Sequence, residues 1–137
     1  MRLSPDDRLL AFRSSFSGQK EIYLVDFPSF ENRRLVSRGP VDQFEWHPEG
    51  SSVFYTSADY RTLNSVAIPT QGDAPATEPV EVLKIPTEIS PRGFQVSKDG
   101  DRFLMLKNIP EPLGADGLPK PKALLMENWF EDFRETP

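Results

Sequence analysis

The sequence contains no cysteine and only one histidine among its 137 residues. Without cysteine it can form neither a disulfide framework nor a thiolate metal site. Apolar stretches are too short to span a bilayer, and the first residues do not form the apolar core of a signal peptide. We therefore expect no membrane insertion and no signal peptide in this chain.

Positive charge is also scarce. Lysine and arginine total 16 against 21 acidic residues, which gives a formal net charge of −5 and an isoelectric point near 4.9. Nucleic acids and anionic membranes both select basic surfaces, whereas the densest basic cluster here is the pair Arg33-Arg34. We expect neither nucleic acid nor a membrane surface as a partner.

A short turn signature, by contrast, occurs three times. Each copy follows alternating apolar residues and precedes a compact apolar run, and the copies are spaced by 43 and 50 residues. They are Ser4-Pro5-Asp6-Asp7, His47-Pro48-Glu49-Gly50 and Ser97-Lys98-Asp99-Gly100. A repeat of this length, built on strand, turn and strand, is typical of propeller blades.

The repeats predict one all-β domain, a partial β-propeller of about three four-stranded antiparallel blades. We place blade one at residues 1–38, blade two at 39–86, and blade three with an aromatic tail at 87–137. The outer blades are expected to be incomplete, since the chain starts partway through a first strand and the third repeat shows three clear strands. The tail at 128–134 fits either a short helix or an edge strand.

Blade packing is predicted from the apolar pattern. The second strand of each repeat is a solid apolar run, as expected where neighbouring blades cover both faces. Phe44 and Trp46 alternate with Glu45 and should pack between blades. The outermost faces would stay open, so the chain is either a fragment of a larger propeller or a possible homodimer through these faces. In a dimer, charge at Phe12 or Leu104 should disrupt assembly.

The turn signatures and their flanking strands resemble the TolB-like, WD40-like propeller repeats of bacteria. The similarity is strongest over residues 4–12 and 21–25. Residues 96–105 with 125–133 resemble the end of propellers attached to bacterial serine/threonine kinases. This resemblance implies a propeller fold. The sequence lacks the kinase motifs themselves, so no phosphoryl transfer is expected.

No catalytic, cofactor-binding or metal-binding residues are predicted. His47 occupies the slot of Ser4 and Ser97 in the sister repeats, so we interpret it as a turn residue. Asp6, Glu49 and Asp99 stand at equivalent places in different blades, and we expect them to bind the turn backbone rather than a metal.

The loops between blades, and those between second and third strands, should share one rim. There we predict a binding surface for a protein or small ligand, with an ordinary solvated rim as the alternative. Its candidate residues are Arg38, Asp42, Asp59, Tyr60, Arg61, Glu88 and Arg92. Trp129 in the tail is a further candidate, for either packing or partner docking.

These observations favour a non-catalytic module for protein interaction or ligand sensing, and not an enzyme. The alternatives are a self-assembling, ring-forming unit and an accessory or gating domain of a peptidase or other hydrolase. The compartment is not assigned. It would be periplasmic or extracytoplasmic if the repeats belong to a larger exported propeller.

Overall fold

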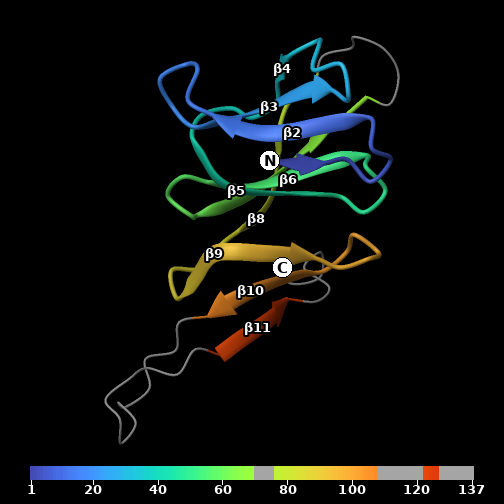
Figure 1. Cartoon of the computed structure of the whole chain (residues 1–137). Coiled ribbons are helices and arrows are strands. Elements are labelled where there is room, and N and C mark those ends of the chain that lie inside the picture. The colour runs from blue at the N-terminus through green and yellow to red at the C-terminus, as the bar shows by residue number, and fades with distance from the viewer. Residues whose placement is uncertain (70–75, 108–121, 127–137) are drawn as a thin grey trace, which may run out of the picture.

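The computed structural model describes residues 1–69, 76–107 and 122–126, and only the backbone of 90–92, 107 and 122–126. Every regular element in this part of the chain is a strand, and the strands form three antiparallel sheets (Figure 1). The all-β prediction is therefore confirmed. The aromatic tail, including Trp129, lies outside the described residues. Within the described part, no helix could cross a membrane.

Each sheet follows the order of the chain, as a propeller blade does. The first contains β1 (Arg2–Leu3), β2 (Leu9–Ser14), β3 (Glu21–Asp26) and β4 (Arg34–Leu35). The second contains β5 (Val41–Trp46), β6 (Ser52–Ser57), β7 (Thr62–Ala67) and β8 (Val80–Lys84). The third contains β9 (Ile89–Val96), β10 (Phe103–Lys107) and β11 (Lys122–Met126).

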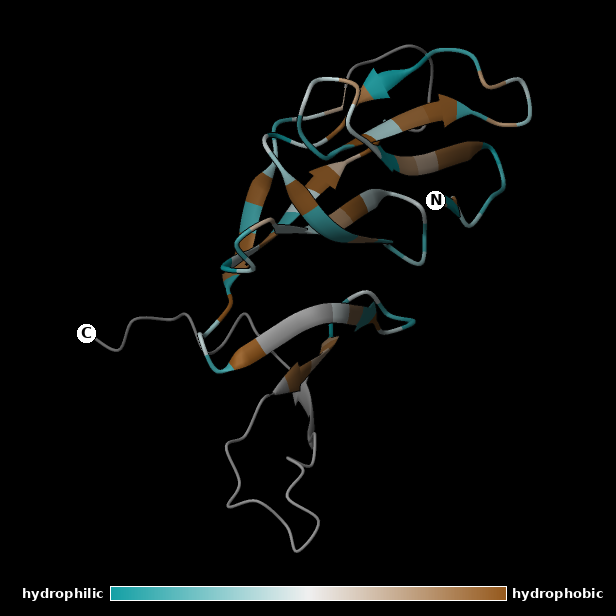
Figure 2. Ribbon diagram, turned by 60° about the vertical axis from the view of Figure 1, so that its left-hand side comes forward, coloured by the Kyte–Doolittle hydropathy of each residue, from teal (hydrophilic) through white to brown (hydrophobic). Residues whose placement is uncertain are grey.

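The sheets are stacked face to face, with one apolar cluster in each space between them. The cluster between the first and second sheets includes Ala11, Ile22 and Leu24 from one side and Val53 and Tyr55 from the other. The cluster between the second and third sheets includes Phe54, Leu63, Leu83, Phe94, Phe103 and Met105. Figure 2 shows these apolar segments on the strands and polar segments on the connecting turns.

Strand β6 shows how one apolar run serves both clusters. Val53 and Tyr55 point to the first sheet, whereas Phe54 between them meets Phe103 of the third sheet, with ring centroids 5.0 Å apart. Successive side chains of a strand face opposite ways, so an uninterrupted apolar run buries both faces. Phe44 and Trp46 are also buried in the first cluster, as the alternation predicted.

The repeated turn has a common set of hydrogen bonds. Ser4 Oγ donates to Asp6 at 2.7 Å and accepts the amide of Leu9 at 2.9 Å. Ser97 and Asp99 make the same bonds in the third sheet, where Ser97 Oγ accepts the amide of Arg102 at 3.0 Å. The serine and aspartate therefore hold the turn, as predicted for such residues.

A fourth copy of this turn joins β6 to β7 and has no proline or glycine to mark it. Ser57 Oγ donates to Asp59 at 2.5 Å and accepts the amide of Thr62 at 3.1 Å. The fourth turn position has a positive φ, 59° at Tyr60 and 79° at Gly100. Tyr60 thus adopts a left-handed backbone that bulky residues rarely tolerate.

The three turn aspartates make stability depend on pH. A serine hydroxyl bound to each carboxylate lowers its pKa, to about 2 for Asp6, with the same direction at Asp59 and Asp99. A carboxyl whose pKa is lower in the folded than in the unfolded state stabilises the fold at pH values above its unfolded-state pKa. This contribution is lost as the pH falls through the folded-state pKa. We expect the urea midpoint to fall between about pH 5 and pH 2.

The double variant Ser57→Ala/Ser97→Ala should show a shallower decline of the urea midpoint over this pH range, because two of the three hydroxyl donors are lost. Ser29→Ala is the control, since Ser29 Oγ accepts the backbone amide of Glu31 and touches no turn carboxylate. An unchanged pH slope in the double variant would show that Asp59 and Asp99 do not contribute to the acid sensitivity.

Candidate functional site on the inner strands

The predicted rim forms as a set of touching loops. Pro40, between the first two sheets, accepts the amide of Ala58 at 3.1 Å. The amide of Ile85, before the third sheet, donates to Arg61 O at 2.7 Å. The connections between sheets and the β6–β7 turn therefore share one edge of the stack, as in a propeller.

The candidate rim residues have separate roles on this edge. Arg38 forms an exposed ion pair with Glu78 at 2.6 Å, and Asp59 holds its own turn. Arg61 and Glu88 are exposed. For Arg92 the structure describes only the backbone. Whether this rim binds a partner stays a prediction.

Asp42 differs from the other rim candidates because it lies in a β-bulge. The pairing of β5 with β6 shifts between Val41 and Phe44, which places an extra residue on β5 at Asp42 and Gln43. The pairing of β9 shifts at the equivalent place, around Arg92. Bulges re-aim side chains and are common beside active sites. Strands β5 and β9 also lie side by side, as the innermost strands of neighbouring blades do.

Polar side chains gather around the β5 bulge. Arg13, from the end of β2, donates to Asp42 O and lies 3.5 Å from its carboxylate. Gln43 Nε2 donates to the same carboxylate at 3.1 Å. We call this group, with Arg2 of β1 and Glu45 of β5, the inner-strand cluster. A cavity of about 390 Å³ is lined by Met1, Arg2, Arg13, Asp42, Gln43 and Phe44, and Glu45 is linked to it through its ion pair with Arg2.

The pKa of the Glu45 carboxyl is altered by its surroundings. Burial raises the pKa of its carboxyl, and the charge of Arg2, 2.7 Å away, offsets part of that rise. Only 18% of the Glu45 side chain is exposed. A largely buried carboxylate with a raised pKa is a candidate for proton transfer.

Sequence analysis identified Asp42 but missed Arg2, Arg13, Gln43 and Glu45. A signal was present for Arg13, which occupies the position of Thr56 and Leu106 in the sister repeats. Arg2 and Glu45 occupy equivalent positions in their repeats, and Gln95, which is also polar, stands there in the third. Polar residues that depart from a repeat are candidates for function, since the fold does not require them.

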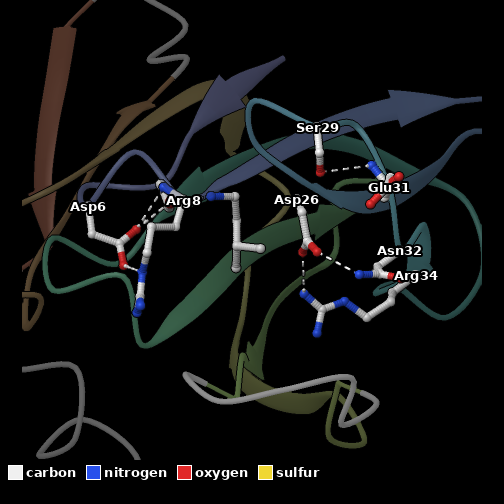
Figure 3. Close-up of polar contacts among 9 residues, drawn as sticks. Asp6, Arg8, Asp26, Ser29, Glu31, Asn32 and Arg34 are labelled. Atoms are coloured by element: carbon white, nitrogen blue, oxygen red, sulfur yellow. Dashed lines mark hydrogen bonds and ion pairs between the residues drawn. The ribbon is translucent and has the colours of Figure 1, made fainter.

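A second polar cavity, of about 330 Å³, lies near the first turn and the β3–β4 loop. Its polar groups stabilise the backbone (Figure 3). Asp6 binds Arg8 within the repeated turn, and Asp26 accepts Asn32 Nδ2 at 2.7 Å and pairs with Arg34 at 3.7 Å. These contacts account for its charged residues, so we favour the inner-strand cluster as the functional site.

His47 belongs to a turn, as the sequence predicted. Its Nδ1 accepts the amide of Glu49 at 3.1 Å, and its ring lies directly over Gly100 of the neighbouring turn. Among the described residues, no three histidine or acidic side chains are grouped to hold a metal ion.

Comparisons with known proteins confirm the propeller fold. No protein-family model and no curated protein matches the sequence. Among solved structures, an oligogalacturonate lyase in complex with manganese matches with TM-score 0.61 and 22% identity, over 77% of this chain and 27% of that one. An oligogalacturonate lyase from Vibrio parahaemolyticus matches with TM-score 0.69 and 15% identity, over 91% and 35%.

A candidate 6-phosphogluconolactonase from Bacteroides uniformis also matches, with TM-score 0.53 and 14% identity, over 92% of this chain and 40% of that one. The chain thus spans less than half the length of each neighbour. At these identities the likeness shows the fold, a β-propeller, and the TolB-like assignment of its repeats is not confirmed.

These neighbours overturn one prediction. The sequence analysis favoured a non-catalytic module and no enzyme, because a single histidine offers no familiar catalytic set. The similar structures are of enzymes, so that prediction was wrong. The reasoning behind that prediction was weak because arginine can stabilise charge and glutamate can transfer a proton without any histidine. The kinase-associated and sensor assignments have no support from the comparisons.

Proposed function

We propose that this chain is part of an enzymatic propeller that acts on an anionic carbohydrate, with the inner-strand cluster as its binding and reaction site. The observation that carries the proposal is that two arginines, Arg2 and Arg13, line one cavity. The lyase and lactonase neighbours have sugar acids in their names, which supports this substrate class. The assignment of the repeats to the TolB-like type is part of the same proposal.

The arginines suit a carboxylate ligand. The bonds of Arg13 to Asp42 use Nη1, and a guanidinium has five N–H donors in a planar fork. Arg2 meets Glu45 through Nη2. Each arginine can therefore bind its protein partner and a uronate carboxylate together, and such pairs are strong when two bonds form side by side.

The reaction that fits this arrangement is β-elimination from a uronate. A base removes the proton on the carbon next to the carboxylate, and the electron pair forms a carbon–carbon double bond. The bond from the neighbouring carbon to the glycosidic oxygen then breaks, and that oxygen takes up a proton. Arg13 would stabilise the charge that develops on the substrate carboxylate, and Glu45 would accept the proton.

The test compares trigalacturonate with the neutral sugar galactotriose by calorimetry, and follows release of unsaturated uronate by ultraviolet absorbance. We expect the acidic sugar to bind selectively, and Arg13→Ala to weaken its binding by about tenfold or more, the value of one charge-assisted contact. Lys84→Gln, which removes a positive charge from β8, is the control. Equal binding of acidic and neutral sugars would contradict the proposal.

A further inference from the structure

Thr56 is a polar residue buried inside the stack of sheets. It lies on β6, and its side chain is 0% exposed. Its Oγ1 accepts the backbone amide of Gln43, on the neighbouring strand β5, at 3.2 Å. Arg13 and Leu106 occupy the same position in the sister repeats, so the fold does not require threonine there. The hydroxyl therefore serves a purpose that is particular to the second blade.

That purpose is to hold the bulge of β5. Asp42 and Gln43 together stand opposite Thr56 alone, whereas the pairing on either side of them is one to one. A bulge takes the extra residue out of the regular ladder of hydrogen bonds. The Thr56 hydroxyl supplies an acceptor for the Gln43 amide, and a buried N–H that loses its acceptor is costly. The hydroxyl thus stabilises the bulged form of the strand.

The bulge brings two neighbouring side chains to one side of β5. Successive side chains of a regular strand face opposite ways. Here, however, Gln43 Nε2 donates to the Asp42 carboxylate at 3.1 Å, and both residues line the cavity of about 390 Å³ at the inner-strand cluster. Arg13 binds the same Asp42, through its carbonyl oxygen and its carboxylate. The place of Arg13 at the cavity therefore depends on the bulge.

We propose that Thr56 is a positioning residue of the inner-strand cluster. Its hydroxyl fixes the bulge, the bulge fixes Asp42, and Asp42 fixes the guanidinium of Arg13. Because Thr56 is fully buried, it cannot touch a substrate itself. A guanidinium that is already oriented loses little freedom when it binds a carboxylate, so affinity depends on the residues behind it. The effect on a sugar ligand rests on the proposed function, but the effect on Arg13 can be measured without any ligand.

The variants Thr56→Val and Thr56→Ser separate the hydroxyl from the rest of the side chain. Valine keeps the shape and removes the acceptor, whereas serine keeps the hydroxyl and loses a methyl group. Nuclear magnetic resonance measures the solvent exchange of the Gln43 amide and the chemical shift of the Arg13 Nε–H. We expect Thr56→Val to speed that exchange by about tenfold or more and to move the Arg13 signal. Thr56→Ser should leave both close to those of the unsubstituted protein.

Calorimetry with trigalacturonate then connects the bulge to binding. Thr56→Val should weaken binding by about tenfold, and Thr56→Ser should retain it. Ser37→Ala is the matched control, because Ser37 Oγ is also buried and accepts a strand amide, that of Ile22, at 3.0 Å. Ser37 follows β4, at the opposite edge of the first sheet from β1. This control loses the same kind of bond, and its affinity for trigalacturonate should be unchanged.

Several results would overturn the proposal. They are an unchanged exchange rate of the Gln43 amide in Thr56→Val, an unmoved Arg13 signal, and a Thr56→Ser variant that behaves like Thr56→Val. Equal losses of affinity in Thr56→Val and Ser37→Ala would also overturn it, because they would indicate a general loss of packing. If the unsubstituted protein does not bind trigalacturonate, the proposed function is wrong, whereas the Arg13 signal still decides whether Thr56 positions that side chain.

Discussion

Phe103→Ala should lower the free energy of unfolding by about 3–5 kcal/mol, the usual cost of removing a buried phenyl ring. Phe103 is fully buried, and its ring centroid lies 5.0 Å from that of Phe54 and 6.3 Å from that of Phe94. It therefore joins β10 of the third sheet to both β6 and β9. Urea unfolding followed by circular dichroism measures the loss.

Leu104→Ala is the matched control on the same strand. Leu104 points to the opposite face and is 39% exposed, so its truncation should cost under about 1 kcal/mol. Similar losses of unfolding free energy in both variants would mean that the face of the third sheet turned away from the second sheet is packed as tightly as the face that contacts it, contrary to the structure.

Glu45→Gln should lower kcat by about 10²–10⁴-fold if Glu45 transfers the proton, because glutamine keeps the size and a polar contact with Arg2 but cannot accept a proton. KM should change little, since the arginines that bind substrate remain. The measurement is the steady-state rate on oligogalacturonate, with circular dichroism to confirm the fold.

The pH profile of kcat/KM distinguishes a catalytic role of Glu45 from a structural one, because a residue that only stabilises the fold would not change this profile. Burial raises the pKa of Glu45, and the base form is the carboxylate, so the activity of the unsubstituted protein should fall as pH drops below that raised pKa. The Glu45→Gln variant should lose this acid limb. A kcat within tenfold of the unsubstituted protein would exclude Glu45 as the base.

The fold was predictable because each repeat combines a local turn with a local apolar pattern. The Ser4 and Ser97 turns were recognised, and both form the expected hydrogen bonds. The turn at Ser57–Arg61 was missed because Tyr60 occupies the left-handed position where the other copies have Asp7, Gly50 or Gly100. Strand β9 spans Ile89–Val96, and its bulge takes up residues that give no strand signal in the sequence.

The candidate site was less predictable because its contacts join different sheets. The Arg2–Glu45 pair and the Arg13–Asp42 pair each connect the first sheet to the second across many intervening residues. Local periodicity carries no information on such pairs. Only comparison of equivalent positions between repeats reveals that Arg13 replaces residues of another kind, Thr56 and Leu106.

Neighbouring residues of β6 pack into apolar clusters on opposite sides of the sheet, and this limits how the chain can change in length during evolution. Val53 serves one apolar cluster and Phe54 the other, so loss or gain of a single residue in the strand would exchange their sides. Both blade interfaces would then fail together. Insertions and deletions are therefore expected to accumulate in the loops, and the strands should change by substitution alone.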